Sequence, residues 1–478
     1  MVDAQRTHGT TVETVMVQRA PWRERASWAL YDFANTIFSM NVATLYFSVW
    51  LIKDLGASST LYAIGSDISS ILVVLSVPFL GALSDARRRR KPWVTGFTII
   101  SCIACAAIGI LGQTTIPISG AATIGRATTS TAWHPTFGSL AWVIIAFTIA
   151  NYAYQAAQPF YNAMMADLAP PAEQGRLSGI GTAVGYVGTI VGLLLVSPFF
   201  GGELPLFGPL PQQFIAQLRA LIPFTSHAGR VSTFVPTALL FLLFSLPLIL
   251  FCRDHYPVVE KTAVSWKRAF TDVWNTLRDA RKYPGATPFI AASFLYQDAI
   301  GTIVSFMAIY AIKAMHFPDG TETTLFLVLT VPAIFGSYLA GHLTDWFGPR
   351  RTLVYTIVAW IMLLIAMIII PSQKGFWGVG LLIGLVFGGV PTAERPMLLS
   401  LIPREEAGRF FSLMLLSSRA AAVAGPLIWG MTVDWLEPVR GTGIAYRAAV
   451  LTVATMFALS LLLLRRVPER SDAVVTET

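Results

Sequence analysis

Two long apolar runs, Leu61–Leu83 and Trp93–Leu111, are joined by a link that ends in five consecutive cations, Arg87 to Lys91. Each run is long enough to cross the hydrocarbon core of a bilayer as a helix, which takes about 20 residues. Five cations in so short a link cannot lie in lipid, and positively charged loops stay on the cytoplasmic side. The link therefore predicts a membrane protein and orients the two helices that it joins.

The same pattern recurs 260 positions later in the chain. The matching positions are Gly81 and Gly341, Leu83 and Leu343, Asp85 and Asp345, and Arg90 and Arg350. A second pair of similar segments, Pro170–Arg176 and Pro403–Arg409, precedes the expected fifth and eleventh spans. These repeats predict a duplicated unit with its substrate site near the middle of the membrane, between the two halves. The alternative is that the basic links only fix topology.

The composition agrees with a membrane protein. Of 478 residues, 54% are hydrophobic and 13% are charged, which a soluble globular protein does not show. The net charge of +8 is no sign of nucleic-acid binding, because 24 of the 34 Lys and Arg residues fall in segments expected in the cytoplasm. We therefore expect a lipid bilayer and a small molecule as partners, and no nucleic acid.

We expect an all-α membrane protein with twelve transmembrane helices in two pseudo-symmetric six-helix bundles. The expected divisions are a cytoplasmic N-terminal tail (1–26), an N-terminal bundle (27–252), a cytoplasmic amphipathic linker (253–286), a C-terminal bundle (287–466) and a C-terminal tail (467–478). A short helix is expected over Gln212–Leu221 in an outer loop. Twelve spans place both termini in the cytoplasm. We expect the protein to lie in the inner (plasma) membrane of a bacterium.

Ionisable residues inside the expected spans are costly and so are usually functional or paired. The ionisable candidates are Asp32, Asp67, Asp298, Glu394, Arg395 and Arg419, and all of these except Asp67 are assigned to the substrate pathway. Asp32 is either functional or neutralised by Arg23 or Arg25, whereas Asp298 lies deeper and is the candidate for proton exchange. Glu394 and Arg395 lie between two prolines that loosen the helix. They contact the solute or form a charge pair with another helix.

Four amides share one face of the expected fourth span. Asn151, Gln155, Gln158 and Asn162 are spaced by four, three and four residues, which is helical periodicity. Because amides both donate and accept hydrogen bonds, they suit the wall of a cavity that holds a polar solute. Hydrogen bonding between helices is the alternative, at about 0.6 kcal/mol per contact.

The basic links resemble the signature of major facilitator superfamily transporters, Gly-x3-Asp-Arg-x-Gly followed by cations. Ala86 and Arg88 depart from it in the first copy, while Gly348 restores the glycine in the second. In that family the Asp pairs with loop cations and a neighbouring helix end and closes the cytoplasmic face. The resemblance thus implies a cytoplasmic gate built from Gly81, Asp85, Arg89, Arg90, Glu173, Arg176, Gly341, Asp345, Arg350, Glu406 and Arg409.

A narrower resemblance, to the vacuole-effluxer-like (unknown major facilitator) branch, is carried by the segment Ser27–Asn35, the Pro170–Gly181 stretch and Phe294–Asp298. It adds Asn35 to the substrate pathway and implies export of amino acids. Glu394 departs from the pattern of that branch.

The chain shows no phosphate-binding glycine loop, no nucleophile elbow and no clustered metal ligands. We therefore expect no enzyme, no cofactor and no metal, but a monomeric secondary transporter of a small polar or zwitterionic metabolite. We expect this transporter to work by alternating access and to export its solute. Protons are the candidate coupling ion. Two alternatives remain open, a proton-coupled exporter of amphipathic compounds and a non-transporting receptor or lipid-handling protein.

Overall fold

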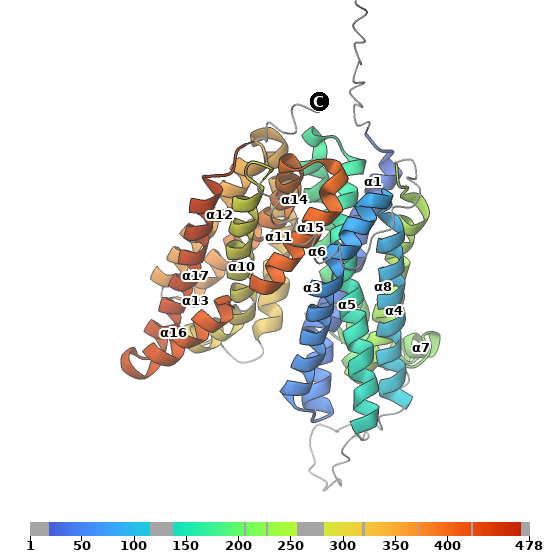
Figure 1. The fold of residues 1–478 in the computed structure, drawn as a ribbon. Helices are drawn as coiled ribbons and strands as arrows, with labels where there is room; N and C mark the ends of the chain where they lie inside the picture. Colours follow the sequence, from blue (N-terminus) through green and yellow to red (C-terminus); the bar gives the residue numbers. More distant parts are fainter. Residues whose placement is uncertain are drawn as a thin grey trace, which may run out of the picture.

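The computed structural model describes residues 19–114, 137–204, 207–225, 228–255, 282–317, 321–370, 372–421 and 424–469. In these ranges, twelve helical segments are long and apolar enough to cross a membrane, and they form two bundles (Figure 1). The expected all-α fold of twelve spans is confirmed. Most of the predicted amphipathic linker lies outside the described residues.

The N-terminal bundle contains α1 (Trp22–Phe38), α3 (Ser59–Arg87), α4 (Lys91–Thr114), α5 (Phe137–Leu168), α6 (Gln174–Gly201) and α8 (Phe234–Phe251). The C-terminal bundle contains α10 (Ala286–Met315), α11 (Thr321–Phe347), α12 (Pro349–Ile369), α13 (Gln373–Phe387), α14 (Gly389–Leu401), α15 (Ala407–Ala421), α16 (Ala424–Arg440) and α17 (Thr442–Leu464). Between α6 and α8 lie an antiparallel pair of two-residue strands, β1 (Glu203–Leu204) and β2 (Gly208–Pro209), and α7 (Gln212–Leu221), a helix with the predicted bounds.

The first span continues from α1 into π-helical turns, η1 (Ser39–Tyr46) and η2 (Trp50–Asp54), on either side of the short α2 (Phe47–Val49). Polar side chains stabilise the wider turns: the Thr44 hydroxyl donates to the carbonyl of Ser39, five residues earlier, at 2.9 Å. The span begins at Trp22, within the expected N-terminal tail (1–26), and is not a uniform α-helix. The hydrophobic pattern did not predict this departure.

The outer surface of the bundles is apolar in the middle and aromatic at the ends. Ile103 on α4 is 66% exposed and Leu243 on α8 is 55% exposed, which in water would be unfavourable but suits contact with lipid. Trp22 at the start of α1 and Trp346 near the end of α11 are exposed, as are Trp142 near the start of α5 and Trp435 in the second half of α16. The first two helix ends lie at one end of the molecule and the last two at the other (Figure 1). Exposed tryptophans at both ends match the aromatic belts at membrane–water interfaces.

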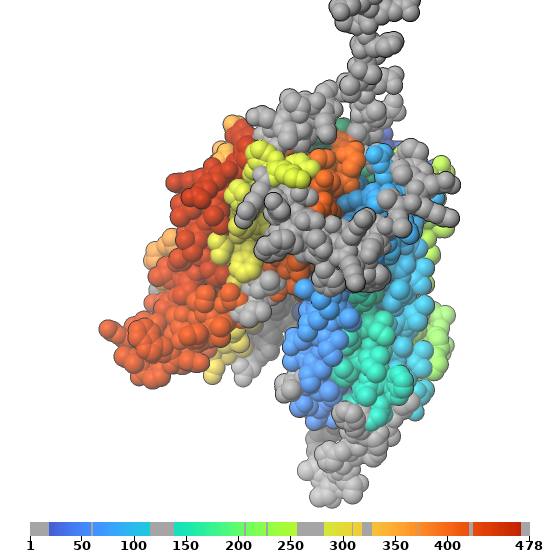
Figure 2. Space-filling model, in the orientation of Figure 1, coloured from blue at the N-terminus to red at the C-terminus, as the bar shows by residue number. Residues whose placement is uncertain are grey.

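The two bundles meet at one end and diverge at the other. We call the end that carries the starts of α1 and α12 the closed end, and the opposite one the open end (Figure 1). Figure 2 shows a hollow between the bundles at the open end. The basic links lie at the closed end, where Arg88 and Gly348 both adopt positive φ values, 48° and 86°. The two turns are not the same, because ψ is 35° at Arg88 and 154° at Gly348. At both positions the positive φ is less strained for glycine than for other residues.

Candidate functional site

Asp85, at the end of α3, bridges to the C-terminal bundle. Its carboxylate accepts hydrogen bonds from the backbone N–H groups of Gly408, at 3.1 Å, and Arg409, at 2.7 Å, at the start of α15. The first N–H groups of a helix have no partner within the helix, and the helix dipole favours a negative charge there. The contact therefore joins the two halves through backbone groups, whatever the side chain at position 409.

Asp345, at the end of α11, makes the matching contact in the opposite direction. It accepts from the N–H groups of Gly175, at 2.9 Å, and Arg176, at 3.2 Å, at the start of α6. The guanidinium of Arg176 adds a hydrogen bond of 2.8 Å. The duplication of the sequence thus appears as two pseudo-symmetric contacts between the bundles.

Glycines allow both contacts because the helices cross almost backbone to backbone. A Cβ atom on Gly341 would lie 2.8 Å from the carbonyl oxygen of Gly175 and 3.1 Å from the Cα of Gly179. On Gly81 it would lie 2.9 Å from the carbonyl oxygen of Gly408. Small residues at helix crossings are typical of membrane proteins, in which close packing holds helices together.

The arginines of the two basic links behave differently. Arg90 is buried and its guanidinium donates to the carbonyl of Ala163 (2.7 Å), to Asp167 (2.7 Å) and, across the bundles, to the carbonyl of Arg404 (2.6 Å). Its counterpart Arg350 donates within its own bundle, to the carbonyls of Leu464 and Arg465, both at 3.4 Å. The expected pairing of Asp with a link cation is thus found for Asp85 and Arg90, 3.8 Å apart, whereas Asp345 pairs with Arg176.

Three further gate candidates contact groups of their own half. Glu173 forms ion pairs with Arg19 at 3.0 Å and Arg25 at 3.5 Å. Glu406 accepts from Tyr283 at 3.0 Å, and the exposed Arg89 accepts from Ser84 at 3.0 Å through its carbonyl. None of the contacts described for these three residues crosses to the other bundle.

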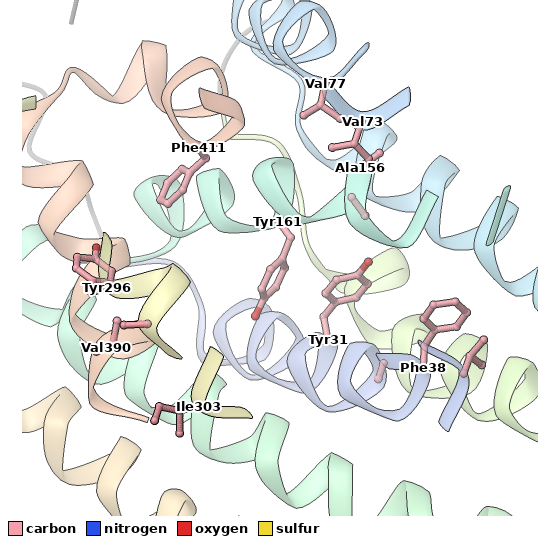
Figure 3. Packing of buried hydrophobic residues seen from close by; sticks show 14 of the residues in the cluster. Tyr31, Phe38, Val73, Val77, Ala156, Tyr161, Tyr296, Ile303, Val390 and Phe411 are labelled. Atoms are coloured by element: carbon pink, nitrogen blue, oxygen red, sulfur yellow. The ribbon is translucent and has the colours of Figure 1, made fainter. Parts of the chain in front are cut away.

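Nearer the middle of the membrane, a cavity of about 180 Å³ lies between the halves. It is lined by residues of α5, α10, α14 and α15, namely Gln158, Pro159, Asn162, Gln297, Pro391, Glu394, Arg395, Phe411, Met414, Leu415 and Ser418. Four of the predicted pathway residues are among them. Figure 3 shows this region, with Tyr161 and Tyr31 on the N-terminal side and Tyr296 and Val390 on the C-terminal side.

Arg395 crosses from the cavity wall to the N-terminal bundle. Its guanidinium lies 3.0 Å and 3.5 Å from the two carboxylate oxygens of Asp32 on α1. It also lies 5.7 Å from the ring centres of Trp28 and Tyr161, within the range of cation–π attraction. Asp32 is therefore neutralised by Arg395, whereas Arg25 pairs with Glu173. The alternative that Arg23 or Arg25 neutralises Asp32 is wrong.

The aromatic pair beneath Arg395 is held rigidly. The indole N–H of Trp28 donates to the carbonyl of Tyr161 at 3.0 Å, and the Tyr161 hydroxyl donates to the carbonyl of Trp28 at 3.1 Å. The two rings are stacked, with their centres 4.7 Å apart. These reciprocal bonds fix the surface on which the guanidinium rests.

Glu394 is buried on the same wall and is held by uncharged groups. Its two oxygens accept from the Tyr296 hydroxyl at 2.8 Å and from the Gln297 amide at 2.7 Å. Among the residues that the structure describes, Glu394 forms no ion pair. The helical run is interrupted at Gly388, and Pro391 fits the first turn of α14, where its missing N–H costs nothing.

The row of four amides on α5 is divided between two environments. Gln158 and Asn162 line the cavity. Asn151 and Gln155 are buried and donate to the hydroxyl of Ser69 on α3, at 2.7 Å and 3.4 Å. Asn151 and Gln155 thus form the hydrogen bonds between helices that were the alternative, whereas Gln158 and Asn162 border a cavity.

The remaining pathway candidates lie outside the lining of this cavity. Asp298 is 1% exposed and accepts from the N–H of Gly425, at the start of α16, at 2.8 Å. Asn35 is buried on α1, and Arg419, on α15, is half-buried within electrostatic range of Tyr154. Sequence reasoning did not assign roles to Trp28, Tyr296 and Gln297, although all three belong to motifs that repeat between the halves or resemble the family.

Comparison with known proteins agrees with this architecture. The family model of the Major Facilitator Superfamily matches residues 32–426 and, in a second match, 325–478. An uncharacterized MFS-type transporter, YxiO, of Bacillus subtilis (strain 168) is 23% identical over 95% of this chain and 97% of its own. Autophagy-related protein 22 of Botryotinia fuckeliana is 24% identical over 42% of this chain and 38% of its own.

Solved structures show the same fold. The MFS transporter FucP in its outward conformation superposes with a TM-score of 0.67 at 13% identity, over 94% of this chain and 98% of that one. A bacterial homologue of the iron transporter ferroportin, in an outward-facing state, gives a TM-score of 0.59 at 14% identity, over 93% of this chain and 98% of that one. With its two pseudo-symmetric contacts and its family match over most of its length, this chain belongs to the Major Facilitator Superfamily.

Proposed function

We propose that the protein exports a small zwitterionic metabolite, such as an amino acid, by alternating access at the cavity between its bundles. The observation that carries the proposal is the pair of adjacent opposite charges on one cavity wall, Glu394 and Arg395, facing the amides of Gln158 and Asn162. A solute with an ammonium and a carboxylate complements both charges, and the amides can donate to or accept from its other polar groups.

Binding would then compete with the contact between bundles. Arg395 is shared between the cavity and Asp32, so a solute carboxylate that takes the guanidinium weakens the Arg395–Asp32 pair. Because the pair joins α14 to α1, its loss removes a link between the halves near the middle of the membrane. This competition would couple occupancy to the rocking of the bundles.

We further propose that the closed end is the cytoplasmic gate, with both termini in the cytoplasm and the protein in a bacterial inner membrane. The Lys and Arg distribution supports this orientation, since the basic links lie at that end. The gate would open when the helix starts of α6 and α15 leave Asp345 and Asp85. Export as the direction rests on the resemblance to vacuole effluxers.

Protons are the proposed coupling ion. Glu394 and Asp298 are buried carboxylates that form no ion pair among the described residues, so either could bind a proton instead of a fixed cation. Asp298 lies away from the solute cavity and is therefore the better candidate for a separate proton site.

A second candidate function, proton-coupled export of amphipathic compounds, is favoured by a different observation. An apolar cavity of about 140 Å³ lies within the C-terminal bundle, lined by Ile303, Trp360, Phe376, Phe387 and other apolar side chains together with Tyr186 of α6. A compound with a large apolar part could use this cavity as well as the polar one.

Counterflow in proteoliposomes tests the two candidates. Vesicles loaded with a mixture of amino acids should accumulate labelled amino acid from outside, and Asn162→Leu should abolish this signal while Gly301→Ala, which places a methyl group in open space, should not. Cysteines at Gln158 and Asn162 should react with water-soluble thiol reagents, whereas one at Asn151 should not. Exchange of hydrophobic cations without exchange of amino acids would support the second candidate instead.

A further inference from the structure

A third cavity, of about 300 Å³, lies at the closed end, where both bundles contribute to its wall. Pro171 and Gln174 come from the N-terminal bundle, and Thr344, Phe347 and the turn Gly348–Arg351 come from the α11–α12 connection. Ser400 of α14 and Glu469, after α17, complete the polar part of the lining. The cavity is adjacent to the contact between Asp345 and the start of α6, because Gln174 directly precedes Gly175.

The cavity is rich in cations. Arg350 and Arg351 line it, and the carbonyl of Arg465, itself an exposed cation, accepts from Arg350 at 3.4 Å. Glu469 is the acidic residue in the lining. The positive charge of these groups exceeds the negative charge of the one carboxylate, so the cavity still attracts an anion.

A carboxylate of the chain itself already binds the guanidinium of Arg351, whose Nε and Nη2 form a fork of two donors. Glu469 accepts from the Nε of Arg351 at 2.7 Å and from its Nη2 at 3.1 Å, which is the bidentate geometry that also suits phosphate. One Glu469 oxygen lies 3.9 Å from Arg350. The side chains of Arg351 and Glu469 are 52% and 51% exposed, so a competing anion can reach the fork from outside.

One side of the cavity continues into the surface that faces lipid. Phe347 lines the cavity and is itself 48% exposed, and its ring packs edge-on against Tyr355, which is 59% exposed, at 6.4 Å between centres. The neighbouring Trp346 is 77% exposed. An anion site with an apolar, lipid-facing edge fits a ligand that has a phosphate at one end and hydrocarbon at the other.

We propose that this cavity binds the phosphate group of an anionic phospholipid, in competition with Glu469. The phosphodiester takes the place of the carboxylate between Arg350 and Arg351, and the acyl chains lie against Phe347 and Tyr355. Since Pro171 and Gln174 belong to the other bundle, a bound headgroup contacts both halves and stabilises the closed end.

Lipid-dependent thermal stability of the full chain in detergent tests the proposal, with phosphatidylglycerol, phosphatidylcholine and inorganic phosphate as probes. Phosphatidylglycerol should raise the melting temperature more than phosphatidylcholine does. Arg351→Gln should raise the apparent Kd for phosphatidylglycerol about tenfold, because a bidentate charged contact is lost. Glu469→Gln should lower that Kd, since it removes the competing carboxylate.

The opposite signs of the two variants separate a specific site from general attraction. Arg87→Gln, at an exposed cation of the N-terminal bundle, is the matched control and should leave the Kd unchanged. Equal stabilisation by the two lipids, or an unchanged Kd in Arg351→Gln, would overturn the proposal. Equal stabilisation by inorganic phosphate at the same concentration would overturn the assignment of a lipid. If Arg351→Gln lowers the melting temperature in the absence of lipid, Glu469→Gln becomes the deciding variant. An unchanged Kd for phosphatidylglycerol in Glu469→Gln would refute the competition.

Discussion

Gly341→Ala is the most direct test of how the closed end is held. The added methyl group would lie 2.8 Å from the carbonyl oxygen of Gly175 and 3.1 Å and 3.3 Å from the Cα atoms of Gly179 and Arg176. All three are backbone atoms of α6, so no side-chain rotation relieves the contact. The helices must separate by about 0.6 Å to reach an ordinary contact of 3.4 Å.

The separation has an energetic consequence at the neighbouring hydrogen bonds. Overpacking of this kind costs about 1–3 kcal/mol. Moving α11 away from α6 also lengthens the bonds of 2.9 Å and 3.2 Å from the start of α6 to Asp345. Because these contacts exist only while the bundles meet at the closed end, the cost falls on that state alone. A cost of about 1.4 kcal/mol shifts the equilibrium tenfold towards states in which this end is open.

Spin labels at the exposed positions Ala172 and Trp346 measure this shift in nanodiscs, because they flank the α6–α11 contact from opposite bundles. The parent protein should give one narrow distance distribution, and Gly341→Ala should add a longer component. Gly301→Ala is the control, since a Cβ atom there meets no atom within 4 Å. If Gly341→Ala keeps the parent distribution and melting temperature, the close crossing does not hold the closed end.

Three further predictions concern individual residues, namely Arg395, Asp298 and Arg88. Arg395→Gln should destabilise the protein by about 3–5 kcal/mol because it leaves Asp32 buried and unpaired. Adding Asp32→Asn should recover part of that loss in mixed-micelle unfolding. Additive costs of the two substitutions would show that the two side chains are not coupled. Asp298→Asn should abolish accumulation driven by a pH gradient but keep solute exchange in proteoliposomes, and accumulation at the parent rate would exclude Asp298 as the proton site. Arg88→Gly should raise the melting temperature, by the equivalent of about 1 kcal/mol, because position 88 has a φ of 48°; a fall would mean that contacts of the Arg88 side chain outweigh the backbone strain.

Local and repeated features of the fold could be predicted from the sequence. Apolar length gave the spans, and Gln212–Leu221 was predicted with the bounds that α7 has. The recurrence of Asp85 as Asp345 predicted two equivalent positions, and both carboxylates do lie at helix starts of the other bundle. Periodicity suffices for such features because the residues that define them are close in the chain or are repeated in it.

Partners distant in the chain could not be predicted. Asp32 and Arg395 are 363 positions apart, and nothing near either residue in sequence indicates that α1 and α14 face each other. The amide row shows a similar limit. Helical periodicity places Asn151 and Asn162 on one face of the helix, but it does not predict which elements pack against that face. Ser69 of α3 is close to one end of the row and the cavity to the other, which depends on how other helices pack against α5.

The unequal arginines of the two links have a mechanical consequence. On the α3–α15 side, Arg90 adds a bond of 2.6 Å across the halves to a backbone carbonyl, whereas Arg350 on the α11–α6 side bonds only to its own bundle among the contacts described. A backbone acceptor cannot rotate away, and the bond survives any substitution of the side chain at position 404. The corresponding guanidinium bond at the α11–α6 edge, from Arg176 to Asp345 at 2.8 Å, comes from a side chain that is 47% exposed, so water competes for it, whereas Arg90 is buried. The α11–α6 edge should therefore part first while α3 and α15 act as a hinge, so that the two repeated halves separate by swinging about one side.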